Sequence, residues 1–305
     1  MQRPRVQDGL AGINAQVLGQ PRLVEKAVAC FLGGGHLLLE GPPGTGKTSL
    51  AKALARQFGL ELSRIQMTSD LLPSDIVGVI RLKPGETEFE FRRGPIFSPC
   101  VLADELNRSN PKTQSALLEA MAEHTVTVDG ATHQLPDPFF VLATQNPFEF
   151  QGVFPLAESQ LDRFTALLAV GNPSMEDELR VYTRTEDPHE AVGPLTIEQT
   201  RSVRKEVASL HASKEMVDYL ARLIRATRDS PDVAYGASVR AGLQLLAMAR
   251  GLAYLRGRDF VTPQEFLDLA PEVLGHRISF AGGSRSSAER SQWIRGVVEK
   301  VSRPR

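Results

Sequence analysis

Short apolar runs alternate with amphipathic stretches through the first part of the chain. Runs of strand length occur at Leu37–Leu39, Glu61–Gln66, Cys100–Ala103, Phe139–Thr144 and Thr165–Val170. Helical patterns, including one over Thr48–Phe58, lie between several of these runs. Because strands that alternate with helices form parallel sheets, this pattern predicts a mostly parallel sheet covered by helices on both faces.

From about Pro173 the strand-length runs disappear and helical periodicity takes over. One predicted helix face carries Met216, Leu220, Leu223 and Ile224. Another, in a long helix that ends near Gly257, carries Leu243, Leu246, Ala247 and Arg250. Capping-box spacing marks two further helix starts, at Thr196 with Gln199 and at Thr262 with Glu265. We therefore expect an α/β domain over residues 1–172 and an all-α domain over residues 173–305.

Two predicted hairpins interrupt the alternation of strands and helices. They pair Val79–Leu82 with Thr87–Phe91 across Lys83–Glu86, and Thr125–Val128 with Ala131–Leu135 across Asp129-Gly130. An Asp-Gly pair between alternating runs is a strong hairpin signal. The hairpins are either plain surface loops or structures that project toward a partner or a central pore. Phe89 and Phe91 are either contacts to such a partner or aromatics packed on their own domain.

Composition narrows the class of protein. The 305 residues suit two domains, and 35 Lys and Arg against 36 Asp and Glu give a net charge of −1. This balance argues against a dedicated nucleic-acid or anionic-membrane surface. Two cysteines, Cys30 and Cys100, lie in apolar runs, and six scattered histidines do not form a zinc site. With no apolar stretch of membrane-spanning length and no signal-peptide pattern, we expect a cytoplasmic protein.

A glycine-rich loop follows the first predicted strand and leads into a helix. The loop and the start of the helix read Gly41-Pro42-Pro43-Gly44-Thr45-Gly46-Lys47-Thr48-Ser49. This strand–loop–helix context is the one in which G-x-x-x-x-G-K-[ST] binds phosphate. Backbone N–H groups would surround the phosphates of ATP, Lys47 would reach the β- and γ-phosphates, and the Thr48 hydroxyl would ligate Mg²⁺.

Two carboxylates end the predicted strand Cys100–Ala103. Asp104 can hold Mg²⁺ directly or through water, and Glu105 is the candidate general base for the attacking water. Asn146, at the end of another buried strand, is either a turn residue or the amide that orients this water. Arg163 is either a surface arginine or a finger supplied to a neighbour's γ-phosphate, and Arg240 is a candidate second phosphate contact.

Together these residues resemble the AAA+ ATPases, and more narrowly the MoxR family. The similarity covers essentially the whole chain. Its segments are Val17–Gln20, Leu71–Gly78, Gly94–Phe97, Ala103–Arg108, Pro111–Met121, Ala143–Pro147 and Leu161–Phe164. The implied fold is a P-loop NTPase (AAA+) core with a parallel β-sheet, followed by an all-α lid domain. The implied hairpins are the helix-2 insert and the pre-sensor-1 hairpin.

The resemblance also implies roles for single residues. They are Walker A for Gly41–Thr48, Walker B for Asp104 and Glu105, sensor 1 for Asn146, the trans-acting finger for Arg163, and sensor 2 for Arg240. The turn containing Leu18 and Gly19 would lie beside the adenine. Val239 stands where the family commonly has proline before sensor 2, and Arg108 competes with Arg163 for the trans contact.

The resemblance implies a homo-oligomeric ring, a hexamer, that hydrolyses Mg-ATP to remodel or mature protein complexes or metalloenzymes. Its partners would carry von Willebrand factor A domains. The alternatives are an AAA+ nucleic-acid motor, a nucleotide-gated scaffold and a small-molecule kinase. The neutral charge counts against the motor, and the full set of Glu105, Asn146 and Arg163 counts against the scaffold. The finger and the long helical segment count against the kinase.

Overall fold

The structure is a computed structural model that describes residues 2–83, 85, 88–147, 152–183, 193–283 and 285–304. Its centre is a five-stranded sheet in which all neighbours are parallel. The strand order is β2 (Leu62–Gln66), β5 (Cys100–Asp104), β8 (Phe140–Gln145), β1 (Leu37–Glu40) and β9 (Ala166–Ala169). The predicted strands and the predicted parallel sheet are therefore confirmed.

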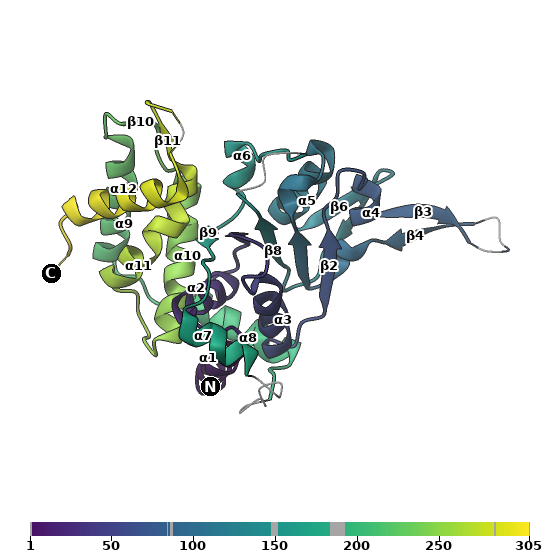
Figure 1. Ribbon diagram of the computed structural model, residues 1–305, viewed down its shortest axis with the longest axis horizontal. Coiled ribbons are helices and arrows are strands. Elements are labelled where there is room, and N and C mark those ends of the chain that lie inside the picture. Colours follow the sequence, from purple (N-terminus) through teal and green to yellow (C-terminus); the bar gives the residue numbers. More distant parts are fainter. Residues whose placement is uncertain are drawn as a thin grey trace.

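Helices cover both faces of this sheet, as predicted (Figure 1). One face packs against α1 (Arg3–Gln16), α2 (Pro21–Leu32) and α3 (Lys47–Gln57). The other packs against α4 (Pro73–Val77) and α5 (Pro111–Glu123). Successive residues alternate between the faces, so that Leu37 and Leu39 join one core cluster and Leu38 joins the other.

Both predicted hairpins form, although Thr87 and the turn residues Pro84 and Glu86 lie outside the described residues. The first pairs β3 (Gly78–Leu82) with β4 (Phe89–Arg93), and the second pairs β6 (Thr125–Val128) with β7 (Ala131–Gln134). Figure 1 shows the β3–β4 hairpin extending well away from the sheet. The Phe91 ring stacks on His133 of the second hairpin at 4.1 Å, whereas Phe89 is 72% exposed.

After β9 the chain is mainly helical. The helices are α7 (Met175–Tyr182), α8 (Ile197–Ala208), α9 (Lys214–Arg228), α10 (Val239–Leu255), α11 (Pro263–Leu274) and α12 (Ser287–Lys300). A short helix, α6 (Glu158–Leu161), precedes β9. Both predicted capping boxes are present, at Thr196 and at Thr262. The expectation that strands disappear here is wrong, because β10 (Val233–Tyr235) pairs with β11 (Ser279–Phe280).

The predicted buried face of α10 is also wrong. Leu243 is 64% exposed, while Ala241, Leu245 and Met248 are fully buried. The buried face of α10 packs closely on α2. A side chain at Gly251 would lie 2.4 Å from the carbonyl oxygen of Ala29, so only glycine permits this approach. Gly251 therefore permits the close approach of α10 to α2, while Leu245 and Met248 are buried on the same helix.

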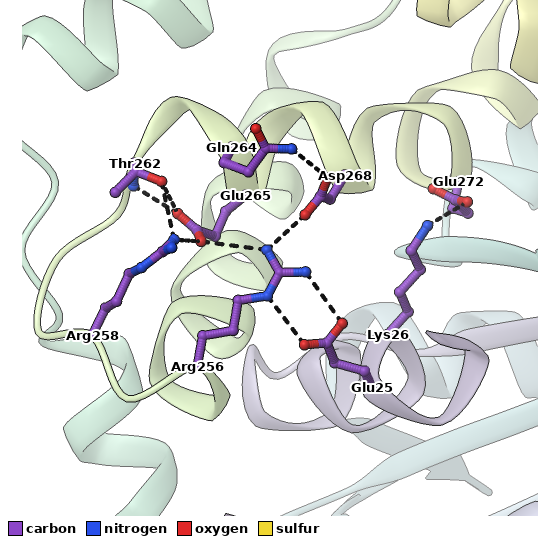
Figure 2. A network of polar contacts seen from close by, with 9 residues as sticks. All are labelled: Glu25, Lys26, Arg256, Arg258, Thr262, Gln264, Glu265, Asp268 and Glu272. Carbon is purple, nitrogen blue, oxygen red and sulfur yellow. Dashed lines mark hydrogen bonds and ion pairs between the residues drawn. The ribbon is translucent and has the colours of Figure 1, made fainter. Parts of the chain in front are cut away.

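A network of charged side chains joins α2 to the helical segment (Figure 2). Arg256 donates to Glu25 of α2 at 3.1 Å and to Asp268 of α11 at 2.6 Å. Lys26 pairs with Glu272 at 2.6 Å. The fully buried Glu265 carboxylate accepts from Arg258 and from the Thr262 backbone N–H. The partners satisfy the buried charge and tie the lid to the core.

Candidate nucleotide-binding site

The glycine-rich loop bridges the end of β1 and the start of α3. Gly44 and Gly46 adopt φ values of 80° and 86°, in the left-handed region that favours glycine. No side chain caps the N-terminus of α3. Its first N–H groups therefore remain available to an anion, and the helix dipole adds positive potential at the same place.

Lys47 lies at the mouth of this loop. Its ammonium donates to the carbonyl oxygens of Gly41 at 2.7 Å and Pro42 at 2.6 Å. Partial burial lowers the pKa of Lys47, and the nearby Asp104 and Glu105 carboxylates oppose this shift. The loop thus holds a cation beside the exposed N–H groups of α3.

Asp104 ends β5 and has partners on both carboxylate oxygens. Thr144 of the neighbouring strand β8 donates its hydroxyl to Oδ1 at 2.7 Å. Arg64 of β2, on the other side, donates to Oδ2 through Nε at 3.2 Å and Nη2 at 2.6 Å. The carboxylate is therefore fixed between two adjacent strands.

Glu105 follows in a left-handed backbone conformation, with φ 58°. Its N–H donates to the Thr144 hydroxyl at 2.9 Å, so one side chain orients both acidic residues. The Glu105 carboxylate accepts from Gln66 at 2.8 Å and from Arg108 at 3.0 Å. Arg108, the alternative candidate for a trans contact, thus pairs within its own chain in this structure.

These groups surround one cavity of about 420 Å³, which lies within the usual size range of ligand sites. It is lined by Pro43, Gly44, Thr45, Gly46, Lys47, Thr48, Ser49, Arg64, Asp104, Glu105, Thr144, Gln145 and Asn146. The structure therefore brings Pro43–Ser49 of the predicted loop together with Asp104, Glu105 and Asn146, whereas Gly41 and Pro42 of the loop do not line this cavity. The Thr48 hydroxyl and the Asp104 carboxylate are hard oxygen donors that suit Mg²⁺, and the loop suits a polyphosphate.

Sequence reasoning missed Arg64, Gln66 and Thr144. Their positions on the strands could have indicated them. Thr144 lies near the end of β8, directly before Gln145 and Asn146, and Arg64 and Gln66 alternate along β2. Carboxyl ends of parallel strands meet at one edge of the sheet. The strand order, which the sequence pattern did not supply, decides that β2 and β8 both flank β5.

The predicted adenine turn lies near the loop but does not line this cavity. Gln20 donates to the Gly171 carbonyl oxygen at 3.1 Å. Gly41 packs against the carbonyl oxygen of Val170, the residue before Gly171. Leu18 and Gly19 are outside the lining set. Gly19 instead packs against Asp177 of α7. The turn is thus connected to the loop through the segment that follows β9.

Arg163 and Arg240 lie together in a second cavity of about 200 Å³. Its lining includes His36 and His124, from the opposite end of the sheet to the glycine-rich loop. The four residues of β1 separate the two ends by about 13 Å. Arg163 donates to the Leu118 carbonyl oxygen at 3.2 Å. The structure does not bring either arginine to the loop of its own chain, including Arg240, which we expected there.

The lid holds the Arg163 segment in place. Buried Arg277 donates to Asp162 Oδ1 at 2.7 Å and to the Thr165 carbonyl oxygen at 3.1 Å. The neighbouring His276 ring contacts the Phe164 carbonyl oxygen at 3.1 Å. These contacts fix the backbone on both sides of Arg163, so this cation is presented from a rigid segment.

His36 is a buried neutral group beside the same cavity. Its Nδ1 accepts from the Val141 N–H and its Nε2 contacts the Met121 carbonyl oxygen, each at 3.1 Å. Burial, followed by the nearby His124, lowers the pKa of His36 to about 3. A second proton has no acceptor at Nδ1, so His36 serves the fold as a neutral side chain.

Neither a reactive thiol nor a metal site made of His, Cys, Asp and Glu side chains is found in the described part of the chain. Cys30 and Cys100 are free and buried, and burial raises the pKa of each thiol to about 12. Among the described residues, no group of three or more His, Cys, Asp or Glu could hold a metal ion. None of the described helices has the length and apolar character needed to cross a membrane.

Comparisons with known proteins agree with this geometry. Residues 36–166 match the family model "ATPase family associated with various cellular activities (AAA)", and residues 225–296 match the AAA lid domain. The chain is 45% identical to YeaC of Bacillus subtilis, covering 87% of this chain and 84% of YeaC. It is 42% identical to Chaperone MoxR1 of Mycobacterium tuberculosis, covering 86% and 72% respectively. A crystal structure from Cytophaga hutchinsonii superposes with a TM-score of 0.88 at 34% identity, covering 99% and 96%.

Proposed function

Because this chain belongs to the MoxR family of AAA+ ATPases, we propose that it hydrolyses Mg-ATP to remodel protein assemblies. The observation that carries this proposal is the single cavity shared by Lys47, Thr48, Asp104, Glu105 and Asn146. A cation, a hydroxyl, two carboxylates and an amide in one site are the groups that phosphoryl transfer to water requires.

In this proposal each group has a separate task. The N–H groups of the loop and Lys47 hold the phosphates, while Thr48 and Asp104 hold Mg²⁺. The metal, when bound, supplies positive charge to the β- and γ-phosphate oxygens. Glu105 accepts a proton from the attacking water, and Asn146 orients that water. Gln66 and Arg108 both donate to Oε2 of Glu105, so these two contacts hold the carboxylate through one oxygen.

We further propose that Arg163 completes the site of a neighbouring copy. Arg163 and Arg240 line one cavity at the opposite end of the sheet from the loop. This position suits delivery of their cations to a second subunit. A head-to-tail contact of this kind, repeated around an axis, closes a ring, which we expect to be a hexamer. Arg108 instead follows β5 and pairs with Glu105 beside the loop of its own chain, so we prefer Arg163 for this task.

The partner is proposed from family resemblance and from charge. A net charge of −1 gives no general attraction to nucleic acid, which disfavours the motor alternative. We propose protein clients, including complexes or metalloenzymes that are being assembled, and a partner with a von Willebrand factor A domain. The β3–β4 hairpin, with Phe89 exposed, is the candidate client contact.

Two substitutions test the proposed activity. Lys47→Ala should abolish tight ATP binding, because it removes the cation of the loop. Glu105→Gln should keep ATP binding but stop turnover, because an amide cannot accept the proton. Binding is measured with a fluorescent nucleotide and turnover by phosphate release, with and without DNA. Near-normal hydrolysis by Glu105→Gln would refute its role as base, and strong stimulation by DNA would favour the motor.

A further inference from the structure

Arg64 and Asp104 form an ion pair at the nucleotide cavity. Arg64 lines the cavity itself and reaches Oδ2 of Asp104 through both Nε and Nη2, at 3.2 and 2.6 Å. The other carboxylate oxygen already accepts from Thr144. Both oxygens of the candidate metal ligand are therefore engaged by protein donors.

The two partners of this ion pair differ in freedom. The Asp104 side chain is 12% exposed and is held from β8 by Thr144, whereas Arg64 is 54% exposed and extends from the edge strand β2. A half-exposed arginine can move its guanidinium into solvent, whereas the buried Asp104 carboxylate cannot, and an arriving cation would replace the charge that Asp104 loses. If the pair opens, Arg64 is the side that moves.

A guanidinium and Mg²⁺ cannot share one carboxylate oxygen in close contact, because two cations repel one another at that distance. Mg²⁺ also requires oxygen ligands in a regular octahedron, whereas Arg64 supplies only N–H donors. Direct coordination of Mg²⁺ by Oδ2 and the contact of Arg64 with Oδ2 are thus alternative states of that oxygen.

We propose that Arg64 is a resident counter-cation that holds Asp104 in the nucleotide-free protein and is displaced when Mg²⁺-nucleotide binds. The inference rests on the proposed function, because it assigns Asp104 to the metal. Arg64 is then a positioning residue that sets the concentration of Mg²⁺ needed to load the site. It keeps a carboxylate beside the loop from standing uncompensated before the metal arrives.

The test is the Mg²⁺ dependence of fluorescent ADP binding, which requires no turnover. Arg64→Ala should lower the Mg²⁺ concentration at half-maximal binding by about tenfold, the effect of losing one charge-assisted competitor. Nucleotide affinity at saturating Mg²⁺ should stay within about twofold of wild type. Arg64→Gln, which retains a polar side chain on the edge strand, provides a second variant with the same expected direction.

Arg108→Ala is the matched control, because it removes an arginine from Glu105 in the same site. It should shift the Mg²⁺ midpoint by no more than about threefold. Equal shifts in both variants would overturn direct competition in favour of a general field effect. Weaker nucleotide binding by Arg64→Ala at every Mg²⁺ concentration would instead make Arg64 a phosphate ligand and also overturn the proposal.

A double-mutant cycle with Asp104→Asn localises the effect. Once the carboxylate is removed, Arg64→Ala should no longer move the Mg²⁺ midpoint, and a persisting shift would contradict the assignment to Asp104. Failure of this inference is distinguishable from failure of the function. A wild-type chain that binds no nucleotide overturns both, whereas tight binding with unmoved midpoints overturns only the role of Arg64.

Discussion

Thr144→Val is a sharp test of how the fold orients the two acidic residues. The Thr144 hydroxyl is buried, donates to Asp104 at 2.7 Å and accepts from the Glu105 N–H at 2.9 Å. Valine has nearly the same shape but can do neither. The variant loses a hydrogen bond to a charged group, worth about 1.5–3 kcal/mol, and leaves a backbone N–H without its acceptor.

Because Glu105 is partly exposed, water offsets some of this loss, and we expect a net destabilisation of about 2–4 kcal/mol. Turnover should fall as well, since the left-handed conformation of Glu105 is held through this N–H. Thr144→Ser keeps both hydrogen bonds and loses only a methyl group, at about 1 kcal/mol. Urea unfolding of both variants measures the difference. A valine variant as stable and as active as the serine variant would refute the reasoning.

Two further predictions follow from buried and exposed aromatic groups. Below about pH 6.5 an unfolded histidine takes a proton that buried His36 cannot, so the free energy of unfolding should fall by up to about 1.4 kcal/mol per pH unit. His36→Gln should remove that part of the slope between pH 7 and pH 5 in denaturant titrations, and an unchanged slope would argue against a neutral His36. Phe89→Ser should leave melting temperature and basal ATPase within error while weakening client stimulation. Phe91→Ser should instead lower the melting temperature, because this ring stacks on His133, and the reverse order would contradict the assignment.

The sequence pattern was sufficient where one local rule determines structure. The glycine-rich loop has its strand, its left-handed glycines and its helix within one short segment, so Lys47 and Thr48 could be placed from the sequence. The five core strands were likewise predictable, because their apolar runs are short and bounded. The roles proposed for these residues remain predictions for experiment.

The rest depended on contacts between segments far apart in the chain. Arg64 and Asp104 meet because β2 pairs with β5, and no local pattern states which strands are neighbours. The buried face of α10 was mispredicted because Gly251 and its neighbours pack against α2 at close range. Arg240 was expected at its own loop, but it lies in the other cavity. Its position depends on how the lid docks on the core, which no local pattern states.

The most direct test of the proposed composite site is a mixing experiment between two inactive variants. Arg163→Ala and Glu105→Gln should each bind ATP nearly normally, yet each should lose turnover by orders of magnitude, about 10³-fold or more for the arginine. In mixed rings, some interfaces combine the Glu105 of one subunit with the Arg163 of the other. We predict that mixing partly restores hydrolysis. An inactive mixture, with subunit exchange demonstrated separately, would contradict the account, as would full wild-type activity under conditions where sedimentation detects only monomer.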